Sequence, residues 1–289
     1  MKENHYLKYL VLLFVLLQVS CESVGGFAAR QALMFMRAPN YFEDPVQVEL
    51  ARAVARGDEA RILRAIEDGA DVNKEGAEGM RPLIWAIAKR NLNGFRILLE
   101  QGASPDVAAN LPNRTSSMTV TSIAAILKDT RYLKMALEHG ADPNAKPEVG
   151  NSNWGPLHHA IHNHHFESVK ILVESGADLR QEPAPAALTR LGGQRYHIVY
   201  YLLQKGADPE QPYRSRYTRP SSLIEMMEIR RHRGIAVMHD PRSEEFSWYM
   251  RVVDYLIDEG YLDAGWNRYL NDETREEAEA LKAEGYHEL

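Results

Sequence analysis

The chain has 289 residues, a formal net charge of −6, 45% hydrophobic residues and one cysteine. One cysteine forms no internal disulfide and does not supply a site built from several thiolates, which excludes disulfide-stapled folds and cysteine-rich zinc or iron–sulfur proteins. With 26% charged residues and an acidic balance, the composition also excludes a polytopic membrane protein and a chain broadly committed to coating nucleic acid.

The amino-terminal segment has the features of an export signal. Lys2 and Lys8 stand before an apolar run over residues 9–17. That run is too short to cross a bilayer as a helix, which needs about 20 residues. It matches the apolar region of a secretory signal peptide, which we place at residues 1–20.

The residues that follow the apolar run resemble the lipobox of bacterial lipoproteins. Val19 and Ser20 suit the two small positions before Cys21, whereas Gln18 departs from the leucine that the family prefers. The resemblance implies that Cys21 carries the lipid, and that Glu22 after it favours the outer membrane. We therefore expect a periplasmic protein that touches the membrane only through a lipid anchor. The alternatives are an ordinary signal peptide cut a few residues later and an uncleaved anchor.

The body of the chain repeats itself. Segments such as 67–73 (EDGADVN) and 138–144 (EHGADPN) recur, and their glycines are separated by 33, 38, 36, 30 and 54 residues. These glycines are Gly69, Gly102, Gly140, Gly176, Gly206 and Gly260. Each follows apolar residues at helical spacing, and a helix that ends in a left-handed residue favours glycine there. The Asp and Asn residues that come next are typical of turns.

A second motif completes the repeat. Residues 81–86 (RPLIWA) and 155–160 (GPLHHA) resemble the Thr-Pro-Leu-His-x-Ala segment of the ankyrin repeat, whose period is about 33 residues. The resemblance covers residues 47–263 and is strongest in the middle. It implies an all-α fold, an ankyrin-repeat solenoid of about six helix-turn-helix repeats. Thr119–Ala125 takes the same helix position in the third repeat without the Pro-Leu pair.

The two ends of the repeat array depart from the regular pattern. Residues 21–46 are expected to form a linker and an amino-terminal cap. The sixth repeat is long, and its excess lies at 230–246, between its two helices. Residues 271–289 hold seven acidic and two basic residues, so they carry −5 of the net charge of −6. We expect residues 264–289 to form an acidic capping helix and tail.

Histidines are dense at positions 158–165. His158 and His162 are four residues apart, a spacing with which a helix can hold a metal ion. The ankyrin resemblance instead implies structural roles for His158 and His165, and no carboxylate or cysteine stands nearby to complete a coordination sphere. We therefore expect no metal and no cofactor. His159 and His162 are expected on the exposed concave face of the solenoid.

The sequence carries no Gly-x-Ser-x-Gly, His-Glu-x-x-His, phosphate-loop or GxGxxG motif. Paired carboxylates such as Glu244 with Glu245 are typical of solvated helix faces. We expect no enzymatic activity and name no catalytic residue.

Aromatic and basic residues mark the candidate contact surface. Trp85 and Lys89 fall at expected concave positions, and Trp154 lies in the connection before Gly155. An exposed tryptophan commonly marks a contact surface, and local packing is the alternative.

A segment rich in arginine and tyrosine adds Tyr213, Arg214, Arg216, Tyr217 and Arg219. These residue types form hot spots in interfaces. Pairing with the acidic tail, or simple solvation, is the alternative.

The resemblance implies one protein partner, bound on the concave face and the projecting connections, and no nucleic acid. For an exported ankyrin protein we expect an immunity protein that binds and occludes a secreted antibacterial toxin, such as a phospholipase effector of a type VI secretion system. The alternative is an envelope scaffold or assembly factor that binds a resident periplasmic protein.

Overall fold

The computed structural model describes residues 36–109, 118–147, 154–180, 195–212, 221–232 and 243–263, with four further positions between 276 and 283. The chain divides into two compact units, residues 1–177 and residues 178–289. Within the described ranges no helix is long and apolar enough to span a membrane.

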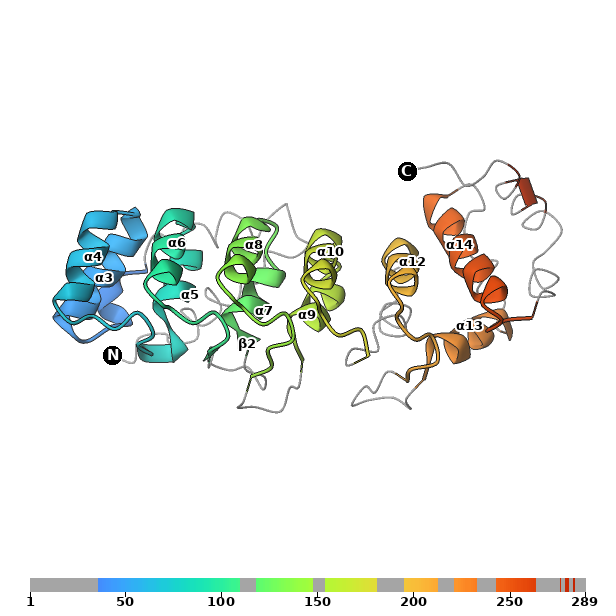
Figure 1. Ribbon diagram of the computed structural model, residues 1–289, viewed down its shortest axis with the longest axis horizontal. Coiled ribbons are helices and arrows are strands. Elements are labelled where there is room, and N and C mark those ends of the chain that lie inside the picture. The colour runs from blue at the N-terminus through green and yellow to red at the C-terminus, as the bar shows by residue number, and fades with distance from the viewer. Residues whose placement is uncertain are drawn as a thin grey trace, which may run out of the picture. The chain divides into compact units, whose positions relative to one another are not determined.

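The described part of the first unit contains four consecutive helix pairs (Figure 1). The first helix of each pair lies in one row, here called the inner helices, and the second in another row, the outer helices. The inner helices are α3 (Pro45–Arg56), α5 (Pro82–Ala88), α7 (Val120–Ala125) and α9 (Pro156–His162). The outer helices are α4 (Glu59–Glu67), α6 (Leu92–Glu100), α8 (Arg131–Glu138) and α10 (Phe166–Glu174).

Local sequence signals explain where these helices begin. Proline occupies the first turn of three inner helices, α3, α5 and α9, where its missing N–H costs nothing. Asp58 and Asn91 cap α4 and α6 through their side-chain oxygens. Thr119 does the same for α7, whose Ser122 N–H it accepts at 3.0 Å. The expected helix at Thr119–Ala125 is therefore confirmed, with Thr119 as its cap rather than its first residue.

All six repeat glycines have positive φ, from 79° at Gly260 to 102° at Gly69. Each follows the end of a helix, as the sequence predicts: the first four follow the outer helices, and Gly206 and Gly260 follow α12 (Tyr196–Gln204) and α14 (Glu244–Asp258). A residue with a Cβ is strained in this conformation, so glycine is what lets the chain turn back toward the next repeat.

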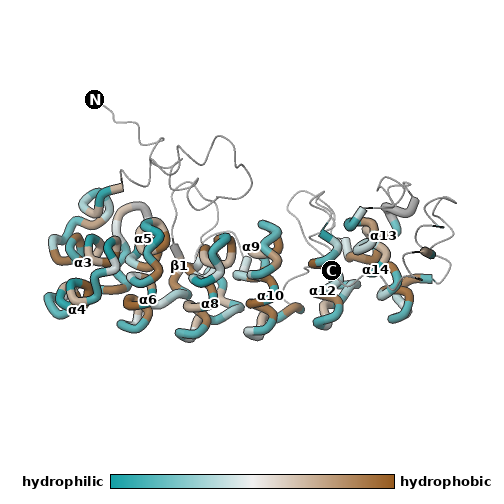
Figure 2. The backbone as a smooth tube through the Cα atoms, turned by 90° about the horizontal axis from the view of Figure 1, so that it is seen from above, coloured by the Kyte–Doolittle hydropathy of each residue, from teal (hydrophilic) through white to brown (hydrophobic). Residues whose placement is uncertain are grey.

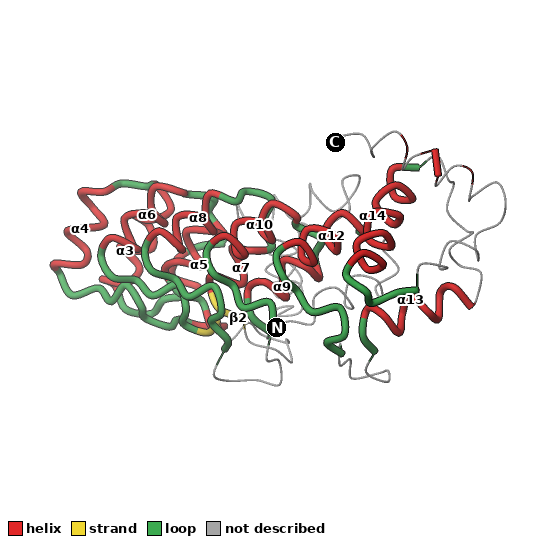
Figure 3. Tube along the Cα trace, turned by 45° about the vertical axis from the view of Figure 1, so that its right-hand side comes forward, coloured by secondary structure: helices red, strands yellow, loops and turns green. Residues whose placement is uncertain are grey.

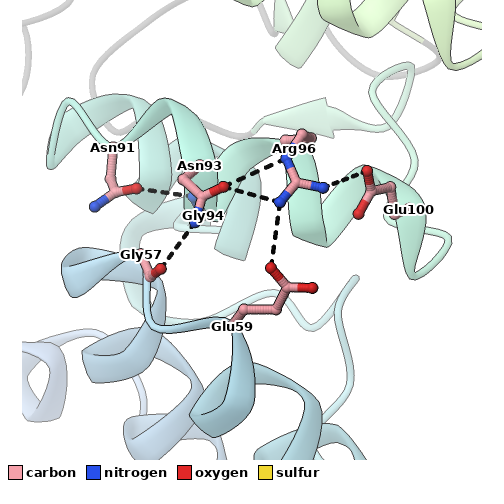
Figure 4. Close-up of polar contacts among 7 residues, drawn as sticks. All are labelled: Gly57, Glu59, Asn91, Asn93, Gly94, Arg96 and Glu100. Atoms are coloured by element: carbon pink, nitrogen blue, oxygen red, sulfur yellow. Dashed lines mark hydrogen bonds and ion pairs between the residues drawn. The ribbon is translucent and has the colours of Figure 1, made fainter.

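The outer helices pack through hydrophobic sides and polar contacts. Figure 2 shows hydrophobic and hydrophilic residues along each of them. Gly94 lets α6 approach α3 closely, because a Cβ there would lie 2.5 Å from the Val54 carbonyl oxygen. On the polar side, Asn93 Nδ2 donates to the Gly57 carbonyl at 2.9 Å, and Arg96 contacts both Glu59 and Glu100 (Figure 4).

Short segments complete the first unit. Two 3₁₀ turns, η1 (Ala38–Asn40) and η2 (Ala77–Gly79), precede α3 and α5. Strands β1 (Ala108–Ala109) and β2 (Met118–Thr119) pair antiparallel in the connection before α7 (Figure 3). This two-residue ladder is a small addition to an otherwise all-α fold.

The second unit contains α12 (Tyr196–Gln204), α13 (Leu223–His232) and α14 (Glu244–Asp258). Helices α12 and α14 are neighbours, and their contact includes Tyr196 and Tyr249 with ring centroids 5.1 Å apart. Helices α13 and α14 flank the predicted insertion, most of which lies outside the described residues. The acidic cap of residues 264–289 also lies almost wholly outside them.

Candidate protein-binding surface

Helix α9 and the residues just before it form a cluster of aromatic rings. Trp154 stacks on His158 with ring centroids 4.1 Å apart and planes at 23°. One helical turn further on, His162 lies 5.5 Å from Trp154 and 6.4 Å from His158. The stacked rings hold Trp154 against α9, so its indole is presented from a fixed position. We call Trp154, His158 and His162 the α9 aromatic cluster.

The three members of the α9 aromatic cluster differ in exposure. Trp154 is 36% exposed and His162 is exposed, whereas His158 is 6% exposed beneath the tryptophan. Partial desolvation of its ring and the proximity of His158 lower the pKa of His162 below the ordinary 6.5. The lowered pKa favours the neutral form of the His162 ring, which together with the indole of Trp154 presents an aromatic surface suited to contact with protein.

Comparing the repeats in register shows why this surface is unusual. The position two residues before an inner helix is Met80 before α5 and Met118 before α7, and both are at most 1% exposed. Trp154 takes that position before α9. Likewise His162 corresponds to Ala88, which is 1% exposed. In the fourth repeat, positions that are buried in the second and third repeats carry exposed aromatic rings.

His159 corrects one prediction. It was expected on the exposed face, but it is only 5% exposed. It corresponds to Trp85 in α5 and to Ile123 in α7, which are also buried. This position of the inner helix points into the packing of the repeats rather than to solvent. The Asn163 side chain donates to the His159 carbonyl at 2.7 Å, which helps to end α9.

Trp85 corrects a second prediction. Expected on the concave surface, it is 1% exposed. Its Nε1–H donates to the Ala51 carbonyl of the preceding inner helix at 2.7 Å. Tyr41 and Phe42 pack on the indole with centroids 5.7 Å and 6.2 Å away. The segment at residues 36–42 thus covers the inner helices of the first two repeats with the protein's own side chains.

Lys89 belongs to the same covered region. Its Nζ lies 4.6 Å from the centre of the Trp85 ring and donates to the Met36 carbonyl at 2.7 Å. Burial lowers the pKa of Lys89 from its ordinary 10.5. The side chain is half-buried, and its ammonium group holds the amino-terminal segment against α5.

The other predicted site residues lie outside the described residues. They are Cys21, Tyr213, Arg214, Arg216, Tyr217 and Arg219. Within the described ranges, no group of three or more His, Cys, Asp or Glu side chains is arranged to hold a metal ion.

Two contributions escaped the sequence analysis. His158 was assigned a structural role, and its part in positioning Trp154 follows only from the stacked geometry. The cover that Tyr41 and Phe42 provide for Trp85 is a contact over more than 40 positions of the chain, which helical spacing does not reveal. The aromatic residues at 41 and 42, placed just before α3, are the sequence feature that points to this cover over Trp85.

Known proteins support this picture of the fold. The family described as "Ankyrin repeats (3 copies)" matches residues 108–183. The chain is 31% identical over 138 residues to Protein PhlB of Serratia liquefaciens, an alignment that covers 47% of this chain and 57% of that protein.

Two further relatives carry the repeat in their names. A putative ankyrin repeat protein of Rickettsia bellii is 32% identical over 124 residues, which cover 35% of this chain and 50% of that protein. Human Rabankyrin-5 is 27% identical over 49% of this chain and 12% of its own length. The chain thus spans little more than half of Protein PhlB and less of the other two. The matched segment, the helix pairs and the repeat glycines together show that this chain contains ankyrin repeats within an all-α fold, and repeats of this kind form protein-binding modules.

Proposed function

We propose that this chain is an exported immunity protein that binds a secreted antibacterial toxin and blocks it by occlusion. The α9 aromatic cluster is the observation that carries the proposal. Its exposed tryptophan is held rigidly by a stacked histidine, as expected of an interface hot spot, because little conformational freedom is lost when a partner covers it.

The position of the cluster supports a binding surface on the third and fourth repeats. Residues 36–42 cover the inner helices of the first two repeats, so the surface for a partner is the third and fourth repeats. If a toxin inserts a side chain beside Trp154, that side chain would pack against α9 and the residues just before it. A type VI secretion phospholipase is the toxin class that we propose, because it attacks the envelope in which an exported lipoprotein would reside.

A competition assay tests the proposal. A strain that lacks the gene is grown with the parent strain, and sensitivity to the parent is measured. We expect the deletion strain to be killed, and wild-type protein to restore survival. Trp154→Ala, which removes the exposed indole, is expected to weaken toxin binding about 10- to 100-fold and to lose protection. Unchanged survival of the deletion strain would contradict the proposal.

A matched control separates contact from general damage. Tyr261 is 39% exposed, close to the 36% of Trp154, but it lies after α14 in the second unit. Tyr261→Ala removes a comparable area of aromatic surface and is expected to protect fully. Immunoblots confirm that both variants accumulate to the wild-type level.

An envelope scaffold is the second candidate, favoured by the same exposed cluster. Capture with the wild-type protein and identification of the bound protein by mass spectrometry distinguish the two. A toxin among the captured proteins supports the immunity function, and a resident envelope protein whose assembly fails in the deletion strain supports the scaffold.

The proposed address has its own test. We infer that Cys21 carries the lipid and that the protein resides in the periplasm, anchored to the outer membrane. Growth with radiolabelled palmitate is expected to label the wild-type protein, and Cys21→Ser is expected to abolish the label. Equal labelling of both proteins would show that the lipid is elsewhere.

A further inference from the structure

A basic pocket lies at the amino-terminal end of the described chain, away from the α9 aromatic cluster. Its volume is about 370 Å³. The apolar part of the wall consists of Met36, Ala38, Pro39, Ala55 and Trp85, and the basic part consists of Arg37, Arg52, Arg56 and Lys89. Among the described residues that line it, none is acidic. We call this the basic pocket.

The positive charge of the basic pocket is poorly compensated. Arg37, Arg52 and Arg56 are all exposed. Within the described residues, Arg37 and Arg56 form no ion pair. Arg52 approaches Glu49 only to 3.9 Å, with both side chains at least 40% exposed. A contact of that kind contributes little, so the pocket presents several nearly uncompensated cations.

Helix stability explains only part of this arrangement. Arg56 stands in the last turn of α3, where a cation interacts favourably with the helix dipole. That argument covers neither Arg37, which precedes η1, nor Lys89, which belongs to the end of α5. Cations from three separate elements meet at one concave site, an arrangement that favours the binding of an anion.

We propose that the basic pocket binds a phosphate group. Guanidinium groups match phosphate oxygens with paired hydrogen bonds, and two arginines one helical turn apart on α3 offer such donors together. The apolar wall formed by Pro39, Ala55 and Trp85 suits the carbon skeleton attached to the phosphate. A phosphate ester therefore fits the pocket better than a free ion does.

The head group of an anionic phospholipid is the source that the chain favours. Met36, in the wall of the pocket, is 15 residues after Cys21. Fifteen residues span at most about 50 Å, so a lipid on Cys21 would keep the pocket near the membrane surface. Basic residues beside a membrane anchor strengthen attachment to anionic lipid. The lipid source rests on the lipid attachment proposed at Cys21, whereas the phosphate site itself does not.

Calorimetric titration of the full-length protein, purified as the cell exports it, tests the site. The probes are inorganic phosphate, short-chain phosphatidylglycerol and short-chain phosphatidylcholine, the last as a zwitterionic control. We expect phosphatidylglycerol to bind more tightly than the other two. The double variant Arg37→Gln/Arg56→Gln is expected to weaken binding about tenfold or more.

Arg64→Gln is the matched control, because Arg64 is an exposed arginine of α4 that does not line the pocket. It is expected to bind as the wild type does. Thermal unfolding without ligand checks that the double variant is folded. If it is not folded, binding of the three probes to the wild-type protein tests the proposal on its own.

Each result is decisive. No binding of inorganic phosphate or phosphatidylglycerol to the wild type, or equal binding to the double variant, overturns the proposal. If the wild type binds inorganic phosphate and phosphatidylglycerol with equal affinity, the result supports a phosphate site but overturns a phospholipid as its source. Loss of a captured protein partner in the double variant, without any phosphate binding, would assign the pocket to that partner's acidic side chains. Survival in the toxin competition is independent of these results, so failure of this site and failure of the immunity function are distinguishable.

Discussion

Helices α5 and α9 occupy the same place in their repeats, have seven residues each and begin with proline, yet they meet different surroundings. All seven residues of α5 are buried, whereas α9 ends in the exposed His162. Residues 36–42 cover α5, and Trp154 with His162 leaves the equivalent surface of α9 aromatic and open. The same positions of the repeat are thus buried in one place and exposed in another, depending on what packs against them.

The largest effect on stability is expected at Trp85, which residues 36–42 cover. Trp85→Ala removes a buried indole, its hydrogen bond to Ala51 and its packing with Tyr41 and Phe42. We expect the free energy of unfolding to fall by about 3–5 kcal/mol. Urea denaturation followed by circular dichroism measures it. A loss below about 1 kcal/mol would show that Trp85 is not a core residue.

A substitution at Trp154, beside the exposed helix α9, is expected to affect partner binding far more than stability. Trp154→Ala removes a side chain that is 36% exposed and whose main partner is the His158 ring. The free energy of unfolding is expected to change by about 1 kcal/mol or less, while partner binding weakens about 10- to 100-fold. The same denaturation experiment compares the two tryptophans directly. Similar losses at both positions would remove the distinction between the covered and the open helix.

The sequence predicts the repeat itself better than it predicts which of its faces are open. Glycine after the outer helices and proline at the start of α5 and α9 are local signals, and the structure confirms them. Exposure is not local. Trp85 and His159 share one register position, which the packing of neighbouring repeats buries. Residues 36–42 add a further cover over Trp85. The basic pocket was also missed, because Arg37 and Lys89 are more than 50 positions apart and meet only after folding.

His162 gives the stability of the folded protein a pH dependence. The pKa of His162 is lowered in the folded protein, so the unfolded chain binds the proton more tightly. Stability is therefore expected to fall as the pH drops through the ordinary value of 6.5. His162→Gln and His162→Phe are both expected to reduce this loss, since neither side chain titrates. Urea denaturation at pH 7.5 and pH 5.5 measures the difference. His165 and His197 also have lowered pKa values, so some dependence persists in both variants.

An unchanged pH dependence in both variants would contradict this assignment of His162. A larger dependence would mean that the folded state binds the proton more tightly than the unfolded chain, the reverse of the direction argued here.

The smallest effect on stability is expected in the turns that link successive repeats. Asn73 accepts the Ser104 N–H and donates through Nδ2 to the Gly102 carbonyl at 3.2 Å, which ties two successive repeats together. Asp106 stands at the same position one repeat later and accepts the Asp142 N–H at 2.9 Å. A carboxylate cannot donate to the carbonyl of the following glycine. Burial raises the pKa of Asp106 above its ordinary value, and the nearby Asp142 carboxylate adds to this, although hydrogen bonds from Asp142 and Thr121 act against it.

Because that raised pKa means that the charged form is disfavoured by folding, Asp106 weakens the protein at neutral pH and less so as the pH falls toward its pKa. Asp106→Asn keeps the acceptor for the Asp142 N–H, replaces the oxygen that accepts from Thr121 by a donor and removes the charge, so we expect a gain of about 0.5–1 kcal/mol at pH 7. The reverse change, Asn73→Asp, is the matched control and is expected to cost a similar amount. Denaturation of both variants at pH 7 measures this, and a loss of stability in Asp106→Asn would mean that the carboxylate's bond to Thr121 outweighs the missing amide donor.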